Sequence, residues 1–495
     1  MTMNLSRRDF LKLTGLIATS TALASCAPAD RLLAPLTNVA WPTLTPADFL
    51  ALNRLTFGPN AEERARFAQI GLANWIEEQL ASESIDDGGC EFRLRNLGTF
   101  GMSASDLFDV SDQIFDNVDR LKVPKELRQA ALLRQVYSRR QLFEVMAEFW
   151  SDHFNISTEK GDCYYLKTVD DREVIRKHAL GSFHDLVWAS AHSPAMLVYL
   201  DNQSNQKGAP NENYARELME LHTLGVEAGY TQQDVMDLAR CLTGWTVKEH
   251  FWRGQFTFDA KVHDTGTKHV LGVEIHEAGQ AEAERVIERL TEHPAAARFI
   301  STKLARRFLA DEPPAEIVDK AARTFERTHG DIRAVLRVIL LDGLPLAQPK
   351  YKRPNHFIAS ALRALNAETD GDDAAQDYLL RMGQIPFLWP TPDGYPDQAQ
   401  AWQGNLMPRW QFAFALARNE IKGTEIDLPR LMETVNAKTL EESTDQIASL
   451  LLGSPLEPTS RDELLIVLRS AGADETESLN IFTAGILSSP AFQWK

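Results

Sequence analysis

Most of the chain alternates apolar and polar positions with the period of an α-helix. The longest such segment, Lys125–Trp150, has apolar side chains three or four residues apart, which predicts a helix or a pair of helices with one buried face. Helical spacing continues over most of the sequence after residue 280. The period changes to two near residues 255–275, which predicts one small β-hairpin there. We therefore expect a mainly α fold: a large multi-helical body with a single hairpin.

Proline-rich and aromatic segments divide this pattern. Four prolines and no helical period mark residues 27–46, which predicts a tether, and a Pro- and Trp-rich loop interrupts the helices much later. We expect a signal peptide at 1–25, a tether at 26–46, a main helical domain with the hairpin at 47–385, the loop at 386–403, and a C-terminal helical region at 404–495 that packs on the main body.

One predicted helix, Asn211–His222, concentrates charged side chains on one face. At 3.6 residues per turn, one stripe carries three carboxylates, a guanidinium and an amide, whereas His222 projects to the opposite, apolar side. The stripe consists of Glu212, Asn213, Arg216, Glu217 and Glu220. Carboxyl groups whose pKa values are pushed apart beside an arginine can act as acid and base, as glycoside cleavage requires. Glu212, Arg216, Glu217 and Glu220 are therefore our candidate catalytic residues.

Aromatic rings that stack on sugars would support this hypothesis. The candidates are Trp150, Trp245, Trp252, Trp389 and Trp402. The alternative is a solvated helix face, because Glu212 with Arg216, and Arg216 with Glu220, have the i,i+4 spacing of ion pairs that stabilise an exposed helix by about 0.2–0.5 kcal/mol each.

Further candidate binding residues lie outside the stripe's catalytic set, in turns and next to aromatics. They are Asn213, His153, Asp201, Trp245, His263, Asp264 and Lys268. Each also has an ordinary structural explanation: loop aspartates form turns, Trp245 can be a core aromatic, and a buried histidine can bond a backbone carbonyl. A His/carboxylate metal site is a further alternative, although no His-Glu-x-x-His motif is present.

The first residues have the pattern of a Tat export signal. Ser6–Lys12 contains the twin arginine, and a short apolar run follows it. Leu23–Cys26 then matches a lipobox, in which cleavage before Cys26 leaves a lipidated cysteine. We expect export by the Tat route to the periplasm or cell envelope, with a membrane anchor at Cys26. The alternative is an ordinary signal peptide that a different signal peptidase removes, in which case the nearby Cys26 stays unmodified.

Charge and cysteine content narrow the choice of partners. The formal net charge of -17 argues against a nucleic-acid partner, because phosphate binding needs a basic surface. Without Cys26, the cysteines Cys90, Cys163 and Cys241 remain, so at most one disulfide can form within the chain. No Cys-x-x-Cys pattern supports a cysteine zinc site or attached haem, and the sequence identifies no cofactor.

Several motifs together resemble the bacterial family called domain of unknown function 1800. They are Leu52–Pro59, Phe149–Phe154, Asn211–Gly225, Gly229–Gln232, Leu242–Thr246, His263–Lys268, Phe299–Leu304 and Gly383–Phe387. The resemblance implies a large, mainly helical, exported bacterial protein, often encoded near a sulfatase-like partner, and no established reaction. One departure is Thr391–Tyr395, where the family tends to show Pro-Pro-Asp-Val-Lys-Gly-Trp.

Three functional hypotheses follow. The first is an exported envelope hydrolase or carbohydrate-active enzyme that uses the Glu/Arg stripe. The second is a non-catalytic assembly or binding protein that acts with the sulfatase-like partner. The third is a metal-dependent enzyme with histidine and carboxylate ligands. The sequence leaves open whether the protein is an enzyme.

Overall fold

The computed structural model describes residues 42–111, 121–248, 253–470 and 474–495. The predicted export signal, the lipobox with Cys26 and Trp252 lie outside the described residues. Within the described ranges, no helix combines the length and apolar content needed to cross a bilayer. The three cysteines Cys90, Cys163 and Cys241 are buried and free.

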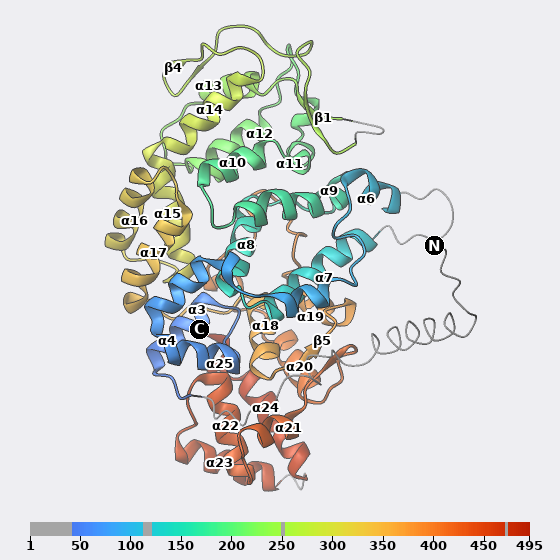
Figure 1. Ribbon diagram of the computed structural model, residues 1–495, viewed down its shortest axis with the longest axis vertical. Coiled ribbons are helices and arrows are strands. Elements are labelled where there is room, and N and C mark those ends of the chain that lie inside the picture. The colour runs from blue at the N-terminus through green and yellow to red at the C-terminus, as the bar shows by residue number, and fades with distance from the viewer. Residues whose placement is uncertain (1–41, 112–120, 249–252, 471–473) are drawn as a thin grey trace, which may run out of the picture.

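The mainly helical prediction is confirmed, and α8 lies near the middle of the molecule (Figure 1). The helices up to and around it are α3 (Pro46–Leu55), α4 (Ala61–Leu80), α5 (Gly88–Leu94), α6 (Ala104–Ser111), α7 (Lys122–Tyr137), α8 (Gln141–His153), α9 (Cys163–Asp170) and the π-helical turn η2 (Asp171–Arg176). The segment predicted as a helix or a pair of helices is the pair α7 and α8, and the region 82–110 contains short helices.

A second group of helices lies above and to the left of α8 in Figure 1. It comprises α10 (Phe183–Ala191), α11 (Pro194–Tyr199), α12 (Glu212–Glu217), the π-helical turn η4 (Leu218–Thr223), α13 (Gln232–Cys241), α14 (Ala281–Glu292), α15 (Pro294–Phe308), α16 (Ala315–Arg327) and α17 (Ile332–Gly343).

The remaining helices form the lower end of the molecule, apart from α18 and α19, which lie below α8 near the middle of the view (Figure 1). They are α18 (Pro354–Ala364), α19 (Asp373–Arg381), α20 (Leu406–Ala417), α21 (Leu428–Thr434), α22 (Leu440–Leu452), α23 (Pro458–Ser470), α24 (Glu475–Ser488) and α25 (Pro490–Gln493). Short 3₁₀ turns are η1 (Ser82–Ser84), η3 (Asn202–Ser204), η6 (Leu344–Leu346) and η7 (Ala399–Ala401). One continuous apolar cluster runs through all three groups of helices.

Local sequence signals explain where many helices begin. Asn60 and Glu63 form a capping box at α4, and Thr231 and Asp234 form another at α13. The Asn211 side chain accepts a hydrogen bond from the Asn213 N–H, so it caps α12. These caps satisfy backbone N–H groups that have no partner inside the helix.

The strands form three two-stranded antiparallel sheets rather than one hairpin. The pairs are β1 (Trp245–Val247) with β2 (Phe256–Phe258), β3 (His269–Val270) with β4 (Val273–Glu274), and β5 (Glu368–Thr369) with β6 (Thr424–Glu425). Residues 256–258 therefore pair backward in the chain, with 245–247, and not with 270–275. The period of two identified the strands within 255–275 but not β1, β5 or β6, and it could not choose between partners on either side.

A buried ion cluster, which we call the hairpin clamp, holds the loop between β2 and β3 onto α13 and α14. Lys268 Nζ lies 2.6 Å from Glu282 Oε2, and His263 Nε2 lies 3.2 Å from Glu282 Oε1. Arg240 pairs with Asp264 at 3.0 Å. Because Lys268, His263 and Glu282 are buried, their charges and polar atoms depend on one another for pairing.

Removing the ammonium from this clamp leaves a buried carboxylate without its closest cation. We expect Lys268→Met to lower the free energy of unfolding by about 3 kcal/mol, measured by chemical denaturation. Lys261→Met, at an exposed position of the same loop, is the matched control and should change it by less than about 0.5 kcal/mol. Equal effects of the two substitutions would show that the clamp does not hold the loop.

Candidate functional site

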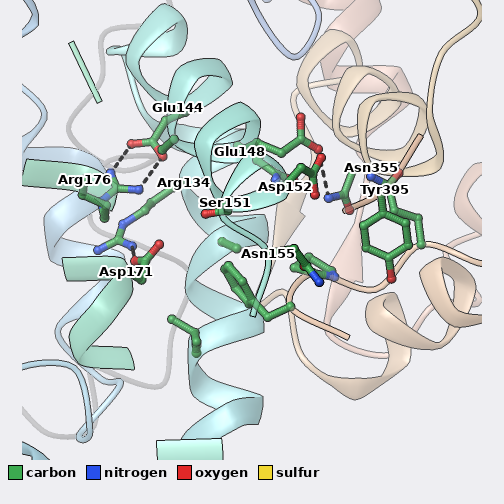
Figure 2. A pocket seen from close by; sticks show the side chains of 17 residues that line it. Arg134, Glu144, Glu148, Ser151, Asp152, Asn155, Asp171, Arg176, Asn355 and Tyr395 are labelled. Carbon is green, nitrogen blue, oxygen red and sulfur yellow. Dashed lines mark hydrogen bonds and ion pairs between the residues drawn. The ribbon is translucent and has the colours of Figure 1, made fainter. Parts of the chain in front are cut away.

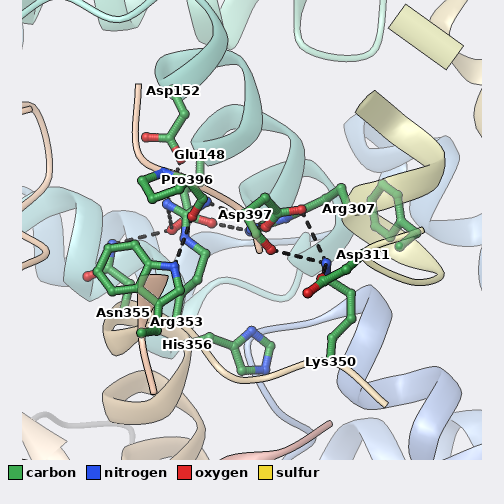
Figure 3. Close-up of polar contacts among 12 residues, drawn as sticks. Glu148, Asp152, Arg307, Asp311, Lys350, Arg353, Asn355, His356, Pro396 and Asp397 are labelled. Atoms are coloured by element: carbon green, nitrogen blue, oxygen red, sulfur yellow. Dashed lines mark hydrogen bonds and ion pairs between the residues drawn. The ribbon is translucent and has the colours of Figure 1, made fainter. Parts of the chain in front are cut away.

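The C-terminal half of α8 presents two carboxylates one turn apart. Glu148 and Asp152 share a face of the helix because they are four residues apart. Arg353, at the start of α18, lies 2.6 Å from Asp152 Oδ2 and 3.6 Å from Glu148 Oε1 (Figure 3). Arg307 of α15 also pairs with Glu148. The end of α8 is thereby tied to two helices that lie far from it in sequence.

The same ion network includes the Pro- and Trp-rich loop. Asp397 of the loop lies 3.1 Å from Arg307 and 3.6 Å from Lys350, and Lys350 lies 2.6 Å from Asp311 (Figure 3). Arg307, Lys350 and Arg353 are buried. We call these three cations, together with the carboxylates of Glu148, Asp152, Asp311 and Asp397, the Arg353 cluster. Its members compensate one another, because an isolated buried charge would be strongly unfavourable.

The Arg353 cluster affects the pKa values of Glu148 and Asp152 differently. Burial opposes ionisation of Glu148, but Arg353 and Arg307 outweigh it and lower its pKa. Burial raises the pKa of Asp152 to about 6; Arg353 opposes that rise and Glu148 adds to it. One carboxyl group is therefore firmly ionised, while its neighbour titrates close to neutral pH.

Asp152 also borders a small cavity between α7, α8, η2, α18 and the start of the Pro- and Trp-rich loop. The cavity has a volume of about 40 Å³, enough for water but not for a sugar ring. Its polar lining includes Glu148, Ser151, Asn155, Asn355 and Tyr395 beside Asp152 (Figure 2). The Asp152 side chain is 19% exposed, so it remains accessible to small molecules at this edge.

On another side of α8, His153 is buried and bonded through both ring nitrogens. Its Nε2 lies 3.0 Å from the carbonyl oxygen of His222, and its Nδ1 lies 2.9 Å from Lys303 Nζ. Burial lowers the pKa of Lys303 to about 8, a fall that Asp152 opposes and Arg306 reinforces. Burial, followed by the charge of Lys303, lowers the pKa of His153 well below its usual value. Asp152 and Lys303 thus both titrate near neutrality, and the charge of Asp152 acts on Lys303 without a direct ion pair between them.

The stripe predicted on 211–222 is only partly formed. Arg216 lies 3.0 Å from Glu212, and Gln232 of α13 bonds both side chains. Among the described residues, no ion pair joins Arg216 to Glu220. The reason is the π-helical turn from Leu218: its wider turn changes the angular position of every later residue, so the projection at 3.6 residues per turn fails there.

Glu217 and Glu220 form a separate acidic group beside the Pro- and Trp-rich loop. Burial raises the pKa of Glu217, and the charges of Glu220 and of Asp393 in the loop raise it further. Burial and Glu220 also raise the pKa of Tyr230. The charge of Asp393 also favours the protonated form of Lys303, so this loop residue influences both the acidic group and Lys303.

The loop approaches the end of α8 closely. The Asn155 amide donates to the carbonyl oxygens of Trp389 and Thr391, at 2.9 and 2.7 Å. Gly394 has φ +72, and a Cβ added there would overlap the carbonyl oxygen of Asp152. Glycine at 394 therefore allows Asp393 and Asp397 to flank the site, although this part of the loop departs from the family's usual sequence.

The other predicted binding residues occupy different places. Asp201 lies 2.8 Å from Lys160, and its Oδ2 is 3.5 Å from the Asn213 amide, so these two predicted residues do meet at the start of α12. Trp245 is buried against Phe256 and His192 as a core aromatic. The residues predicted around 263–268 belong to the hairpin clamp.

The tryptophans proposed for sugar stacking are mostly inaccessible. Trp150, Trp245 and Trp402 are buried, and only Trp389 is partly exposed among those that the structure describes. In the described part of the chain, no three His, Cys, Asp or Glu residues are arranged as a metal site.

Comparison with known proteins agrees with the resemblance seen in the motifs. The profile of the family described as "Protein of unknown function (DUF1800)" matches residues 50–494. The chain belongs to this family. No curated protein and no solved structure matches it.

Sequence reasoning predicted His153 but missed Asp152 and Lys303, the two groups of the site whose pKa values lie nearest neutrality. Asp152 stands within the family motif Phe149–Phe154, and Lys303 within Phe299–Leu304, so both motifs marked the site without indicating a role. Arg353 and Asp397 had no signal, because their importance arises from contacts between distant segments. The roles predicted for Glu212, Arg216, Glu217 and Glu220 stay predictions.

The close approach of the loop can be tested at Gly394. We expect Gly394→Ala to lower the free energy of unfolding by about 2 kcal/mol more than Gly383→Ala, because both have positive φ but only Gly394 faces a backbone oxygen. Gly404→Ala, with open space and no positive φ, should be nearly neutral. Denaturation curves and protease sensitivity of the loop provide the measurement, and similar losses at 394 and 383 would argue against the contact.

Proposed function

We propose that this protein is an exported hydrolase in which Asp152 is the general base and Lys303 is the general acid. The observation that carries this proposal is that Asp152, near the end of α8, has a pKa of about 6, and that Lys303 of α15, which bonds the next residue of α8, has a pKa of about 8. Between those values Asp152 is ionised and Lys303 is protonated. Both groups then have the form that their role requires near pH 7.

The reaction follows from these two states. The Asp152 carboxylate removes a proton from a water molecule, whose oxygen forms the new bond to the substrate. The bond to the leaving group breaks, and the leaving group takes a proton from the Lys303 ammonium. The small polar cavity beside Asp152 is suited to hold that water, because Ser151, Asn155 and Asn355 supply hydrogen-bonding groups around it.

The predicted stripe contributes to this proposal through its second half. Glu217 and Glu220, with Asp393, form an acidic border at the same region and are suited to bind a polar or cationic part of the substrate. Glu212 and Arg216 form an ion pair that also engages Gln232, which suits a structural role on the helix surface. A carbohydrate substrate has less support than hydrolysis itself, since Trp389 is the only partly exposed tryptophan among those candidates that the structure describes.

The cellular location is part of the proposal. The twin-arginine segment and the lipobox support export by the Tat route and a lipid anchor at Cys26 in the periplasm or cell envelope. The acidic net charge of -17 suits an extracytoplasmic protein without a nucleic-acid partner.

The pH dependence of hydrolysis tests the assignment of acid and base. A screen with p-nitrophenyl esters, p-nitrophenyl glycosides and peptide anilides should identify the class of bond. For that substrate, kcat/KM should follow a bell with limbs near pH 6 and pH 8. Asp152→Asn should lower kcat by about 10²–10⁴-fold, whereas Asp319→Asn, which breaks an exposed pair with Arg298, should leave it unchanged.

Lys303→Arg makes the test independent of folding defects. Arginine keeps the positive charge but does not deprotonate near pH 8, so the alkaline limb should disappear while activity near pH 7 falls. Glu217→Gln and Glu220→Gln should raise KM more than they lower kcat. No hydrolysis of any of the three bond classes, or a wild-type profile in Lys303→Arg, would refute the proposal.

A second proposal is a non-catalytic assembly protein, and α20 favours it. Leu406, Met407, Trp410 and Phe414 are exposed on this helix and fall within an arc of roughly 100° at 3.6 residues per turn. The opposite side of α20 is apolar and buried. A helix that is apolar on nearly all sides normally has a cover on each of them. The partner that we propose is the sulfatase-like envelope protein implied by the family.

Co-purification from the native envelope separates the two proposals. The double substitution Trp410→Ser with Phe414→Ser should abolish recovery of the sulfatase-like partner, because it removes two aromatic anchors from the exposed face. Ile466→Ser, on the exposed side of α23, is the control and should not affect recovery. Recovery that is equal in both variants would exclude α20 as the contact surface.

A further inference from the structure

The imidazole of His153 is held in one protonation state by its two partners. A carbonyl oxygen only accepts hydrogen bonds, so His153 Nε2 must carry the hydrogen that it donates to His222 O at 3.0 Å. In the neutral ring, Nδ1 is then an acceptor, and it lies 2.9 Å from Lys303 Nζ. A doubly protonated ring would place an N–H against the Lys303 ammonium. The geometry therefore selects the neutral ring with hydrogen on Nε2.

The ring is also fixed in orientation by aromatic neighbours from several segments. Their ring centroids lie 4.6 Å (Phe154), 5.4 Å (Trp150), 6.2 Å (Phe149), 6.3 Å (Phe299) and 6.4 Å (Phe183) from that of His153. Such packing leaves little room for the ring to flip and exchange its nitrogens. Both hydrogen-bond directions are thus determined by the fold.

The π-helical turn η4 supplies the carbonyl group. Leu224 N–H bonds Met219 O at 2.8 Å, five residues back, and no backbone N–H of the described residues after this turn bonds His222 O. Gly225, with φ +84, ends the turn, and a Cβ there would come within 3.4 Å of the Phe299 ring. The His222 carbonyl is therefore free to accept from α8, and α15 can pack against the end of η4.

The charged groups around Lys303 come from three segments. Asp152 of α8 and Asp393 and Asp397 of the loop favour its protonated form, whereas Arg306 on its own helix opposes it. The His222 ring is also neutral, because burial and then the charge of Lys303 lower the pKa of His222 to about 3. His153 stays neutral throughout the range in which Lys303 titrates, so it accepts from the ammonium without competing for the proton.

We infer that His153 is a positioning residue: its neutral imidazole, fixed as one tautomer by the main chain of η4, holds the Lys303 amine at the proposed active site. The catalytic purpose of this positioning rests on the proposed function, whereas the geometry of His153 rests on its two hydrogen bonds. It assigns the segment 211–223 a contribution through its backbone, in addition to its acidic side chains.

Competitive labelling of lysines with acetic anhydride measures the effect without a substrate. His153→Phe keeps the ring volume but removes the acceptor, so the ammonium of Lys303 loses a stabilising partner. We expect the labelling profile of Lys303 to move about one unit toward lower pH, with a roughly fivefold faster rate at pH 7, because the unprotonated fraction of an amine with a pKa of about 8 rises by that factor. Lys320, which pairs with Asp342 at the surface, should label as in wild type.

His153→Asn places an amide oxygen near the position of Nδ1 and should restore at least half of the shift. Long-range ¹⁵N–¹H spectra of the wild-type protein should show His153 with hydrogen on Nε2 from pH 5 to 9. A Lys303 profile that His153→Phe leaves unchanged, or a spectrum of a charged or Nδ1-protonated ring, would overturn the inference.

These outcomes are distinct from failure of the proposed function. If labelling shifts as expected but Lys303→Arg keeps the alkaline limb of activity, the positioning contact stands and the catalytic assignment of Lys303 falls. If the alkaline limb disappears in Lys303→Arg but His153→Phe labels normally, the catalytic assignment stands and His153 is only a packing residue.

Discussion

The Arg353 cluster is the constraint on which the site depends. The guanidinium of Arg353 pairs with Asp152 and Glu148 of α8. Arg307 of α15 pairs with both Glu148 and Asp397 of the Pro- and Trp-rich loop. Ions removed from water are stable only when their partners are held in good geometry. The cluster therefore requires α8, α15, α18 and the loop to meet in one arrangement, and any displacement of one segment would leave a buried charge without its partner.

The cations of the Arg353 cluster compensate the charges of Glu148 and Asp152 to different extents, and the pKa values of these two carboxyl groups differ as a result. Glu148 faces two arginines and remains ionised, whereas Asp152 is buried with a weaker share of the same positive charge and a carboxylate one turn away. Lys303 has no carboxylate in direct ion-pair contact among the described residues, and its close partner is the neutral ring of His153. Desolvation raises the pKa of the Asp152 carboxyl group and lowers the pKa of the Lys303 amine, so the two values approach each other.

Much of the fold was predictable because its signals are local. Capping residues such as Asn60, Asn211 and Thr231, and the helical spacing between them, depend only on near neighbours in sequence. The site was less predictable for two physical reasons. The pairing of Asp152 with Arg353 joins residues 201 positions apart, and the π-helical turn at Leu218 has no signature in hydrophobic period. The segment 211–222 was recognised as important, but its division into an ion pair and an acidic group was not.

The π-helical turn explains why one short segment can serve two purposes. Before it, Glu212 and Arg216 keep α-helical spacing and form a pair that stabilises the helix surface. At the junction, Glu217 is the last residue of α12 and Glu220 lies within the π-helical turn, and this turn leaves the carbonyl of His222 free for His153. A regular α-helix would have continued the Glu212–Arg216–Glu220 ladder instead. The change of helix type at Leu218 therefore ends the ladder of ion pairs and leaves a main-chain carbonyl free for α8, and neither consequence can be read from composition or from a projection at 3.6 residues per turn.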